Sequence, residues 1–117
     1  MNQSSAFVKT EDLAWETAGN EVKRKVLAYD SDLMMVHVRF SKGAIGYVHT
    51  HPHRQVTFVE QGSFEVQIAQ VKTILRKGDS FIVPPDVEHG VVALEDGDLL
   101  DVFTPAREDF LAAAKPK

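Results

Sequence analysis

Residues 33–40 read LMMVHVRF, a short stretch in which one of the two alternating sets of side chains is entirely apolar. That set is Met34, Val36, Val38 and Phe40, and the side chains between its members are Met35, His37 and Arg39. Because successive side chains of a strand point to opposite faces, a period of two predicts a strand with one buried face. The stretch therefore favours a β-sheet protein.

Similar short segments follow this one and are separated by turn residues, mainly Gly, Pro and Asp. They are QVTFVEQG (55–62), SFEVQIA (63–69), QVKTILRKGD (70–79), SFIVPP (80–85) and GVVALEDG (90–97). Many short strands with regular turns are typical of an all-β sandwich or barrel. Phe64–Ile68 and Val71–Leu75 are expected to form a hairpin, although their connection has no Asn-Gly or Asp-Gly signal.

One helix is predicted near the C-terminus, in the segment TPAREDFLAAAK (104–115). Thr104 suits the N-cap position, and Pro105 suits the first helical position because its missing N–H needs no partner there. Acidic residues and then alanines follow. We expect the helix to be short.

Length and charge limit the classes of function. A chain of 117 residues is expected to form a single domain over residues 1–117, and 44% hydrophobic with 26% charged residues is a globular composition. A net charge of −4 argues against binding to nucleic acid or to an anionic membrane surface. The one basic cluster, Lys23-Arg24-Lys25, lies inside the alternating stretch EVKRKVLAY and is interpreted as a solvated strand.

The chain contains no cysteine, which excludes a disulfide framework and a thiolate metal site. Its first ten residues, MNQSSAFVKT, lack the apolar core of a signal peptide, and no apolar run is long enough to span a membrane. A cytoplasmic protein is the resulting expectation.

Three of the five histidines lie in residues 46–55, GYVHTHPHRQ. On a strand His49 and His51 would project side by side, close enough for one cation to take a nitrogen from each. Pro52 is expected to turn the chain, since proline cannot donate to a sheet ladder. His53 has the same parity as the other two, so parity alone does not exclude it.

Two further residues are candidate metal ligands. Gln55 begins a new alternation after the turn, and its amide oxygen is a possible third ligand. His89 follows the Pro-rich turn of GDSFIVPPDVEHG (78–90) and is a possible fourth. A lone histidine near a strand end is more often solvated than metal-bound, so each candidate is weak when taken singly.

Taken together, these residues resemble the two sequence motifs of the cupin superfamily. The first motif matches Gly43, His49-Thr50-His51, Gln55 and Gly62, with Gln55 where many cupins have glutamate. The second matches Gly78, Pro84 and His89, while Asp86 and Ala93 depart from its usual glycine and asparagine. The resemblance implies a double-stranded β-helix (jelly-roll) barrel that holds one divalent transition-metal cation, Ni, Zn, Mn, Fe or Co. Its implied ligands are His49, His51, Gln55 and His89, which leaves His53 outside the ligand set.

A narrower resemblance covers most of the chain and is to the KdgF family of pectin-degradation cupins. The segments that carry it are LAWETAGNEVKRKVLAYDSDLMMV (13–36), HTHPHRQVTFVEQGSFEV (49–66) and VEHGVVALEDGDLLDVFTPAREDF (87–110). Members of this family open the ring of 4,5-unsaturated monouronates and yield a linear ketone. The resemblance implies a catalytic group of Asp101, Phe103 and Arg107. Arg54, next to Gln55, stands where related sequences have an acid.

The chemistry of these residue types suits such a reaction. Three imidazoles and an amide are neutral ligands, so a divalent cation would keep its full charge for an anionic substrate. Asp101 is a candidate for proton transfer and Arg107 for binding the negative charge of the substrate. The alternatives are that Asp101 is only a structural partner of Arg107, and that Phe103 is only a core residue.

Three classes of function remain open at this point. The first is an isomerase acting on a small anionic sugar; the second is a metal-dependent cupin oxygenase, which would use a similar histidine-rich site with a position open for dioxygen. The third is a non-catalytic sugar- or metal-binding cupin. The Asp101–Arg107 pair favours the first. A homodimer is expected, because barrels of this size leave sheet edges that pairing would cover.

Overall fold

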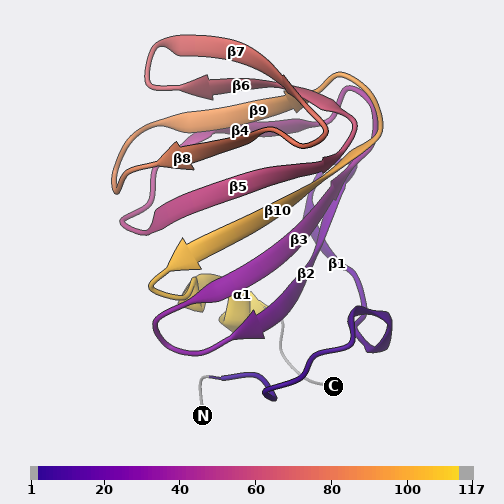
Figure 1. The fold of residues 1–117 in the computed structure, drawn as a ribbon, viewed down its shortest axis with the longest axis vertical. Coiled ribbons are helices and arrows are strands. Elements are labelled where there is room, and N and C mark those ends of the chain that lie inside the picture. The colour runs from indigo at the N-terminus through magenta and orange to yellow at the C-terminus, as the bar shows by residue number, and fades with distance from the viewer. Residues whose placement is uncertain (1–2, 114–117) are drawn as a thin grey trace.

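The computed structural model of the protein describes residues 3–113, and within them ten strands form two antiparallel sheets that face each other (Figure 1). The six-stranded sheet has the order β1 (Glu16–Gly19), β2 (Val22–Tyr29), β3 (Met34–Phe40), β10 (Gly97–Thr104), β5 (Arg54–Gln61), β8 (Ser80–Val83). The four-stranded sheet has the order β4 (Ile45–His49), β9 (His89–Ala93), β6 (Ser63–Ile68), β7 (Val71–Arg76). A 3-10 helix, η1 (Thr10–Asp12), precedes the strands, and a helix, α1 (Glu108–Ala113), follows them. The predicted all-β jelly-roll fold with a short terminal helix is confirmed.

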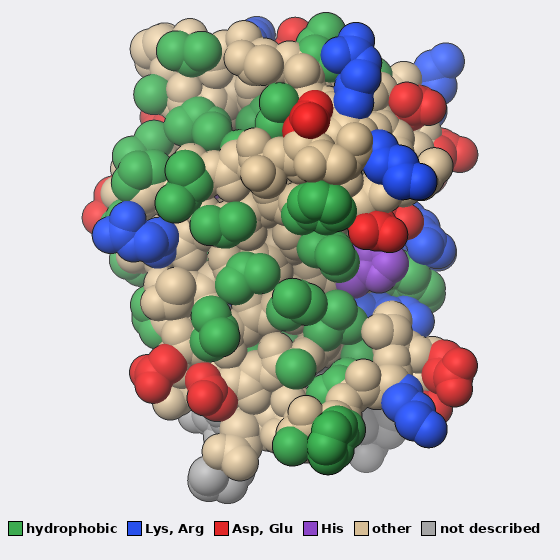
Figure 2. Space-filling model, in the orientation of Figure 1, with side chains coloured by type: hydrophobic (Ala, Val, Ile, Leu, Met, Phe, Trp, Pro, Cys, Tyr) green, Lys and Arg blue, Asp and Glu red, His purple; other side chains and the backbone are tan. Residues whose placement is uncertain are grey.

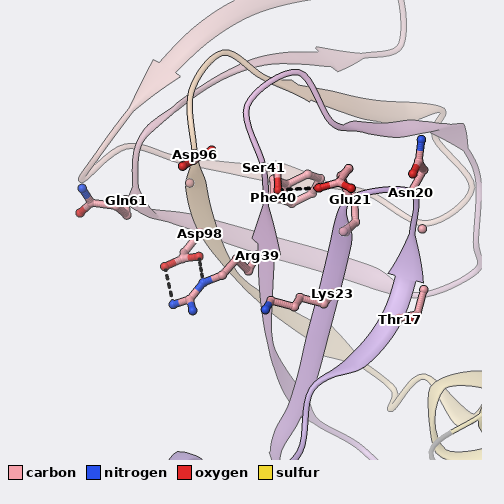
Figure 3. Close-up of a pocket in the computed structure, with 13 residues that line it drawn as sticks. Thr17, Asn20, Glu21, Lys23, Arg39, Phe40, Ser41, Gln61, Asp96 and Asp98 are labelled. Carbon is pink, nitrogen blue, oxygen red and sulfur yellow. Dashed lines mark hydrogen bonds and ion pairs between the residues drawn. The ribbon is translucent and has the colours of Figure 1, made fainter.

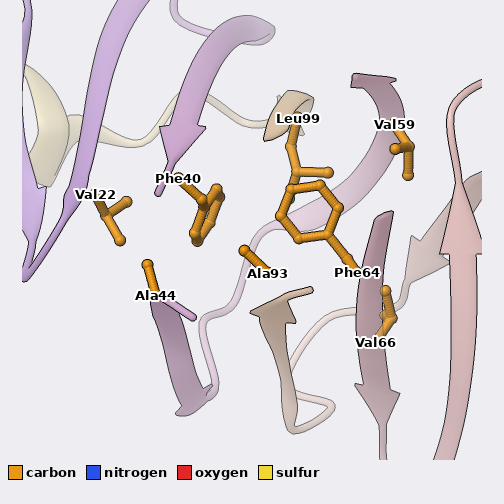
Figure 4. Packing of buried hydrophobic residues seen from close by; sticks show 8 residues of the cluster. All are labelled: Val22, Phe40, Ala44, Val59, Phe64, Val66, Ala93 and Leu99. Atoms are coloured by element: carbon orange, nitrogen blue, oxygen red, sulfur yellow. The ribbon is translucent and has the colours of Figure 1, made fainter. Parts of the chain in front are cut away.

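The hydrophobic core lies between the two sheets. Its main cluster takes side chains from both of them (Figure 4): Val22, Phe40, Ala44, Val59, Phe64, Val66, Ala93 and Leu99. Phe40 and Phe64 meet edge to face with ring centroids 5.2 Å apart. Full burial of such a side chain contributes roughly 1.5–3 kcal/mol, so this cluster is the main contact holding the sheets together.

The opening stretch behaves as its alternation predicts. Met34, Val36 and Phe40 are buried in β3, while Met35 is 40% exposed on the opposite face. On that outer face an apolar row crosses four paired strands, and its members are Met35, Val102, Val56 and Ile82. Hydrophobic side chains are also scattered over the middle of the face drawn in Figure 2. The expected homodimer stays a prediction.

One local expectation, the start of the C-terminal helix, needs correction. The helix begins at Glu108 rather than at Pro105, because Thr104 is the last residue of β10 and pairs with Arg54 of β5. Thr104, which the capping preference assigned to the helix N-terminus, is instead paired in the sheet. The final residues of the expected helix, 114 and 115, lie outside the described residues. Neither η1 nor α1 is long and apolar enough to cross a membrane.

The expected hairpin is present as β6 and β7, with Ile68 paired to Val71. Ala69 opens the intervening turn with φ = 54°, a left-handed conformation that usually favours Gly or Asn. Because an alanine occupies this left-handed position, the sequence has no Gly or Asn there to signal the turn.

Candidate metal centre

The two sheets bring the candidate ligands together from opposite sides of the barrel. His49 is the last residue of β4 and His89 the first of β9, and the two pair directly in the four-stranded sheet. Gln55 faces inward from β5 of the six-stranded sheet and is 6% exposed. The residues thus converge although forty positions of sequence separate His49 from His89.

The structure corrects the placement of His51. β4 ends at His49, so the two histidines are not side by side on one strand. The chain bends at Pro52, as expected, and the carbonyl of His51 accepts a hydrogen bond from the backbone N–H of Asp86 at 2.8 Å. Asp86 itself has φ = 66°, which explains why a glycine is usual at this place in the motif.

Gly90 allows β4 and β9 to approach closely beside the histidines. A Cβ at this position would lie 2.9 Å from the carbonyl oxygen of Gly46 and 3.0 Å from the backbone nitrogen of Val48. Both atoms belong to the backbone of β4, which cannot move aside as a side chain can. The pairing of His49 with His89 therefore depends on a glycine at position 90.

We expect Gly90→Ala to push β4 away from β9 and to lower the free energy of unfolding by about 1–3 kcal/mol. Metal affinity should fall as well, because His49 and His89 lie on the separated strands. Gly46→Ala is the matched control, since its Cβ would meet mainly the Val91 side chain, at 3.1 Å, which can shift. Urea denaturation and metal titration measure both effects. Equal behaviour of the two variants would contradict this account.

Backbone carbonyls fix the tautomer of all three histidine rings. The contacts are His49 Nδ1 to Tyr47 O at 2.8 Å, His51 Nδ1 to His53 O at 3.0 Å and His89 Nδ1 to Val87 O at 2.9 Å. A carbonyl oxygen only accepts, so each Nδ1 carries a proton, and the neutral tautomer that this selects has its lone pair at Nε2.

Ring nitrogens of these three histidines lie within 4.8 Å of one another. Nε2 of His89 is buried and has no hydrogen-bond partner among the residues that the structure describes, which is costly unless something positive binds it. Burial also lowers the pKa of His89 to about 4, despite the hydrogen bond to Val87 O, so the ring is neutral at neutral pH. A neutral imidazole is the form that binds metals.

Gln55 completes the set through its side-chain oxygen. Its Nε2 donates to Thr57 Oγ1 at 2.8 Å and lies 3.5 Å from Asp101 Oδ1, an orientation that turns Oε1 toward His51. Oε1 and Nε2 of His51 are 3.0 Å apart. Both atoms are acceptors, so without a cation between them their lone pairs would repel.

This donor set fits a divalent transition metal. It offers three imidazole nitrogens and one amide oxygen, a composition that suits Zn, Ni, Fe, Co or Mn. His53 is not in the converging group; its contribution is the carbonyl that holds His51.

The candidate catalytic residues line a cavity of about 380 Å³ that also contains His49, Gln55 and His89. Asp101 faces it from β10, and its Oδ1 accepts a hydrogen bond from Thr57 Oγ1 at 2.7 Å. Burial raises the pKa of Asp101 to about 6, although the Thr57 hydrogen bond and the charge of Arg107 act in the opposite direction. Phe103 is 2% exposed and packs against the His51 ring at 5.7 Å.

Arg107 also lines the cavity, but its ion pair is with Asp109. Its Nε and Nη2 donate to the two carboxylate oxygens of Asp109 at 3.1 and 2.9 Å. The side chains that donate to Asp101, among residues 3–113, are those of Thr57 and Gln55. Within the described residues the direct ion pair of Arg107 is thus with Asp109, while the charge of Arg107 still acts to lower the pKa of Asp101.

The raised pKa of Asp101 predicts a pH dependence of stability in the metal-free protein. Because the pKa in the folded state exceeds the usual 3.8, folding favours the protonated carboxyl. The stability that the protonated Asp101 carboxyl adds to the folded state is fully present below about pH 4 and is lost as the pH rises through about 6. The free energy of unfolding of wild type minus that of Asp101→Asn should therefore fall over this range and then level off.

Urea denaturation at a series of pH values measures this difference. His89 has a shift of opposite sign, but it is present in both proteins and its effect cancels. If the difference in unfolding free energy between the two proteins does not change with pH, the pKa of Asp101 is not raised in the folded state.

Two other places are less suited to be the site. Arg54, beside Gln55, is exposed on the outer face of β5 and does not line the cavity.

A larger depression of about 670 Å³ lies at the other end of the six-stranded sheet (Figure 3). Arg39 in its lining is bonded twice to Asp98, at 2.8 and 3.2 Å. The histidine cavity, by contrast, contains His89, whose buried Nε2 has no hydrogen-bond partner within residues 3–113.

The roles of two residues at the site were missed in the sequence. Thr57 links Gln55 to Asp101, and its signal was a polar residue in the inward alternation of β5. Arg24 was interpreted as part of a solvated strand, but it lines the cavity while Lys23 beside it is exposed. Its signal was its parity, which it shares with Val22 and Val26.

A jelly roll with three converging histidines and a glutamine defines a cupin, and the family model described as Cupin domain matches residues 36–103. The chain belongs to the cupin family. Among its relatives, the pectin degradation protein KdgF of Dickeya dadantii (strain 3937) is 48% identical over 103 residues, which cover 86% of this chain and 94% of the relative.

Two solved structures extend this comparison. An RmlC-like cupin from Shewanella frigidimarina NCIMB 400 has a TM-score of 0.91 and 47% identity, and the match covers 94% of this chain and 99% of that one. KdgF from Halomonas sp. has a TM-score of 0.87 and 38% identity, with 92% and 99% covered.

Proposed function

We propose that this protein is a metal-dependent isomerase that opens the ring of 4,5-unsaturated monouronates and releases a linear ketone. The observation that carries the proposal is the cavity itself, in which a charge-neutral ligand set lies beside a buried carboxyl and an arginine. The similarity to KdgF, a pectin degradation protein, supports this substrate class, because pectin is a polymer of uronic acids.

The reaction needs no co-reactant. In the cyclic substrate the ring oxygen joins the anomeric carbon, C1, to C5, which is double-bonded to C4. Loss of the proton from the hydroxyl on C1 and cleavage of the bond between C1 and the ring oxygen give an aldehyde and an enolate. Protonation at C4 then forms the ketone at C5, so the net change is an isomerisation.

Asp101 is the residue that we assign to proton transfer. Thr57 and Gln55 both contact its Oδ1, which holds the carboxylate in one orientation and leaves Oδ2 for the hydroxyl proton. A pKa near 6 lets the group accept a proton and return it at near-neutral pH. The same carboxyl is then able to supply the proton that C4 requires.

The other residues at the cavity bind the substrate or orient the side chains that do so. Arg107 supplies a positive charge for the substrate carboxylate, and Asp109 fixes its direction. Phe103 supports the ring of His51 and the guanidinium of Arg107, whose Cζ lies 5.1 Å from the centroid of its ring. A cation held by His49, His51, Gln55 and His89 would supply Lewis acidity for the negative charge that develops on the enolate.

The test is to mix the metal-loaded protein with lyase-generated unsaturated galacturonate and to follow the absorbance of its conjugated double bond. We expect accelerated loss of absorbance without oxygen uptake, and a chelator should abolish it. Oxygen consumption would instead identify an oxygenase. Metal binding without any effect on unsaturated monouronates would identify a non-catalytic binding protein.

A further inference from the structure

Arg24 is an unusual residue for its position in the sheet. It lies on β2 opposite Glu16 of β1 and Val38 of β3, on the inward face that it shares with Val22 and Val26. Only 14% of its side chain is exposed. A charged group on an inward apolar face is unfavourable unless it has partners, so its contacts indicate its role.

Two contacts hold the Arg24 side chain, and neither uses the end of its guanidinium group. Nε donates to Glu16 Oε1 at 2.7 Å, and Cζ lies 3.8 Å from the centroid of the Phe110 ring in α1. Nη1 and Nη2 donate to no group of residues 3–113. The guanidinium is thus oriented by protein groups while two of its nitrogens stay free.

Arg107 is held in the same manner at the same ring. Its Cζ lies 4.1 Å from the centroid of Phe110, and Asp109 engages its Nε and Nη2. Two guanidinium groups therefore pack on one aromatic side chain, and both line the cavity. Both groups carry a positive charge at the same cavity, so an anion bound in the cavity would be attracted to both.

The charges of the cavity agree with such an anion. Arg24, Arg107 and a cation on neutral ligands are positive, and Asp101 is the one acidic residue among those lining the cavity. Glu16 and Asp109, which pair with the two arginines, do not line it. A cavity of about 380 Å³ accommodates a monosaccharide. We propose that Arg24 and Arg107 together bind the carboxylate of a small sugar acid, and that Arg24 makes the site prefer acids over neutral sugars.

This inference rests on the proposed function for the kind of ligand, but its test needs no turnover. Galacturonate has a saturated ring and cannot undergo the reaction, and galactose is its neutral counterpart. We expect Arg24→Met to weaken galacturonate binding to the metal-loaded protein by about 10- to 100-fold, since a hydrogen bond to a charged group contributes roughly 1.5–3 kcal/mol. The affinity for galactose should not change.

Two further variants separate binding from a structural role. Arg24→Lys keeps the charge and should restore part of the galacturonate affinity. Lys23→Met removes a neighbouring exposed charge from the same strand and should leave both sugars unaffected. Calorimetric titration gives the affinities, and metal content with thermal denaturation verifies that each variant is folded.

The proposal is overturned if Arg24→Met keeps the wild-type affinity for galacturonate, or if it weakens both sugars equally. Either result would mean that Arg24 has only a structural role, in which it packs β2 against α1. Loss of galacturonate binding in Arg24→Met, combined with a wild-type protein that leaves unsaturated uronates unchanged, would support this inference while refuting the proposed reaction.

Discussion

Asp101→Asn is expected to lower kcat by about 100- to 10,000-fold, the usual contribution of a general acid–base group. The amide is nearly isosteric and can still accept the hydrogen bond from Thr57, so fold and metal content should be retained. It cannot act as a base near neutral pH. Steady-state kinetics on the unsaturated uronate, with metal analysis of the same samples, measures the effect.

The matched control for this variant is Asp98→Asn. Asp98 lies on the same strand but points outward to Arg39, so its replacement should leave kcat unchanged. If Asp101→Asn unfolds the protein while its folded fraction turns over normally, Asp101 has a structural role and the catalytic assignment is wrong.

Replacing His49 and His51 together by alanine is expected to remove the metal and, with it, all measurable turnover. Two of four ligands are lost, and Nε2 of His89 would remain buried without a cation. Metal content per chain, measured after dialysis, is the primary readout because it does not depend on the substrate.

His37→Ala serves as the control for the loss of a histidine. His37 is on β3, where its Nε2 lies 3.6 Å from Asp98 Oδ2, away from the cavity. Its replacement should leave the metal content unchanged. A double variant that still binds one metal per chain would refute the ligand set.

The strands and the candidate metal ligands were predictable because their signals are local. Alternation in LMMVHVRF identifies its buried face without any knowledge of partners, and the spacing from His49 to Gln55 matches a motif of a known family. The position of His51 was harder, since a strand that ends at His49 cannot be told from one that continues.

What the sequence could not indicate depends on contacts between distant strands. Thr57 meets Asp101 only because β5 and β10 pair in one particular register. Arg24 has the parity of the inward residues Val22 and Val26, but its contacts with Glu16 of β1 and Phe110 of α1 follow from how these elements meet in the fold. Thr104 was assigned to a helix because a cap rule does not account for competition from a neighbouring strand.

The three carbonyl contacts that orient the histidine rings use the main chain of Tyr47, His53 and Val87. Any amino acid except one that distorts the local backbone supplies the same oxygen, so these positions are free to change without altering the metal ligands. Tyr47 is 72% exposed and also lines the cavity. Divergence at position 47 can therefore reshape the mouth of the cavity while the carbonyl contact that orients the His49 ring is kept.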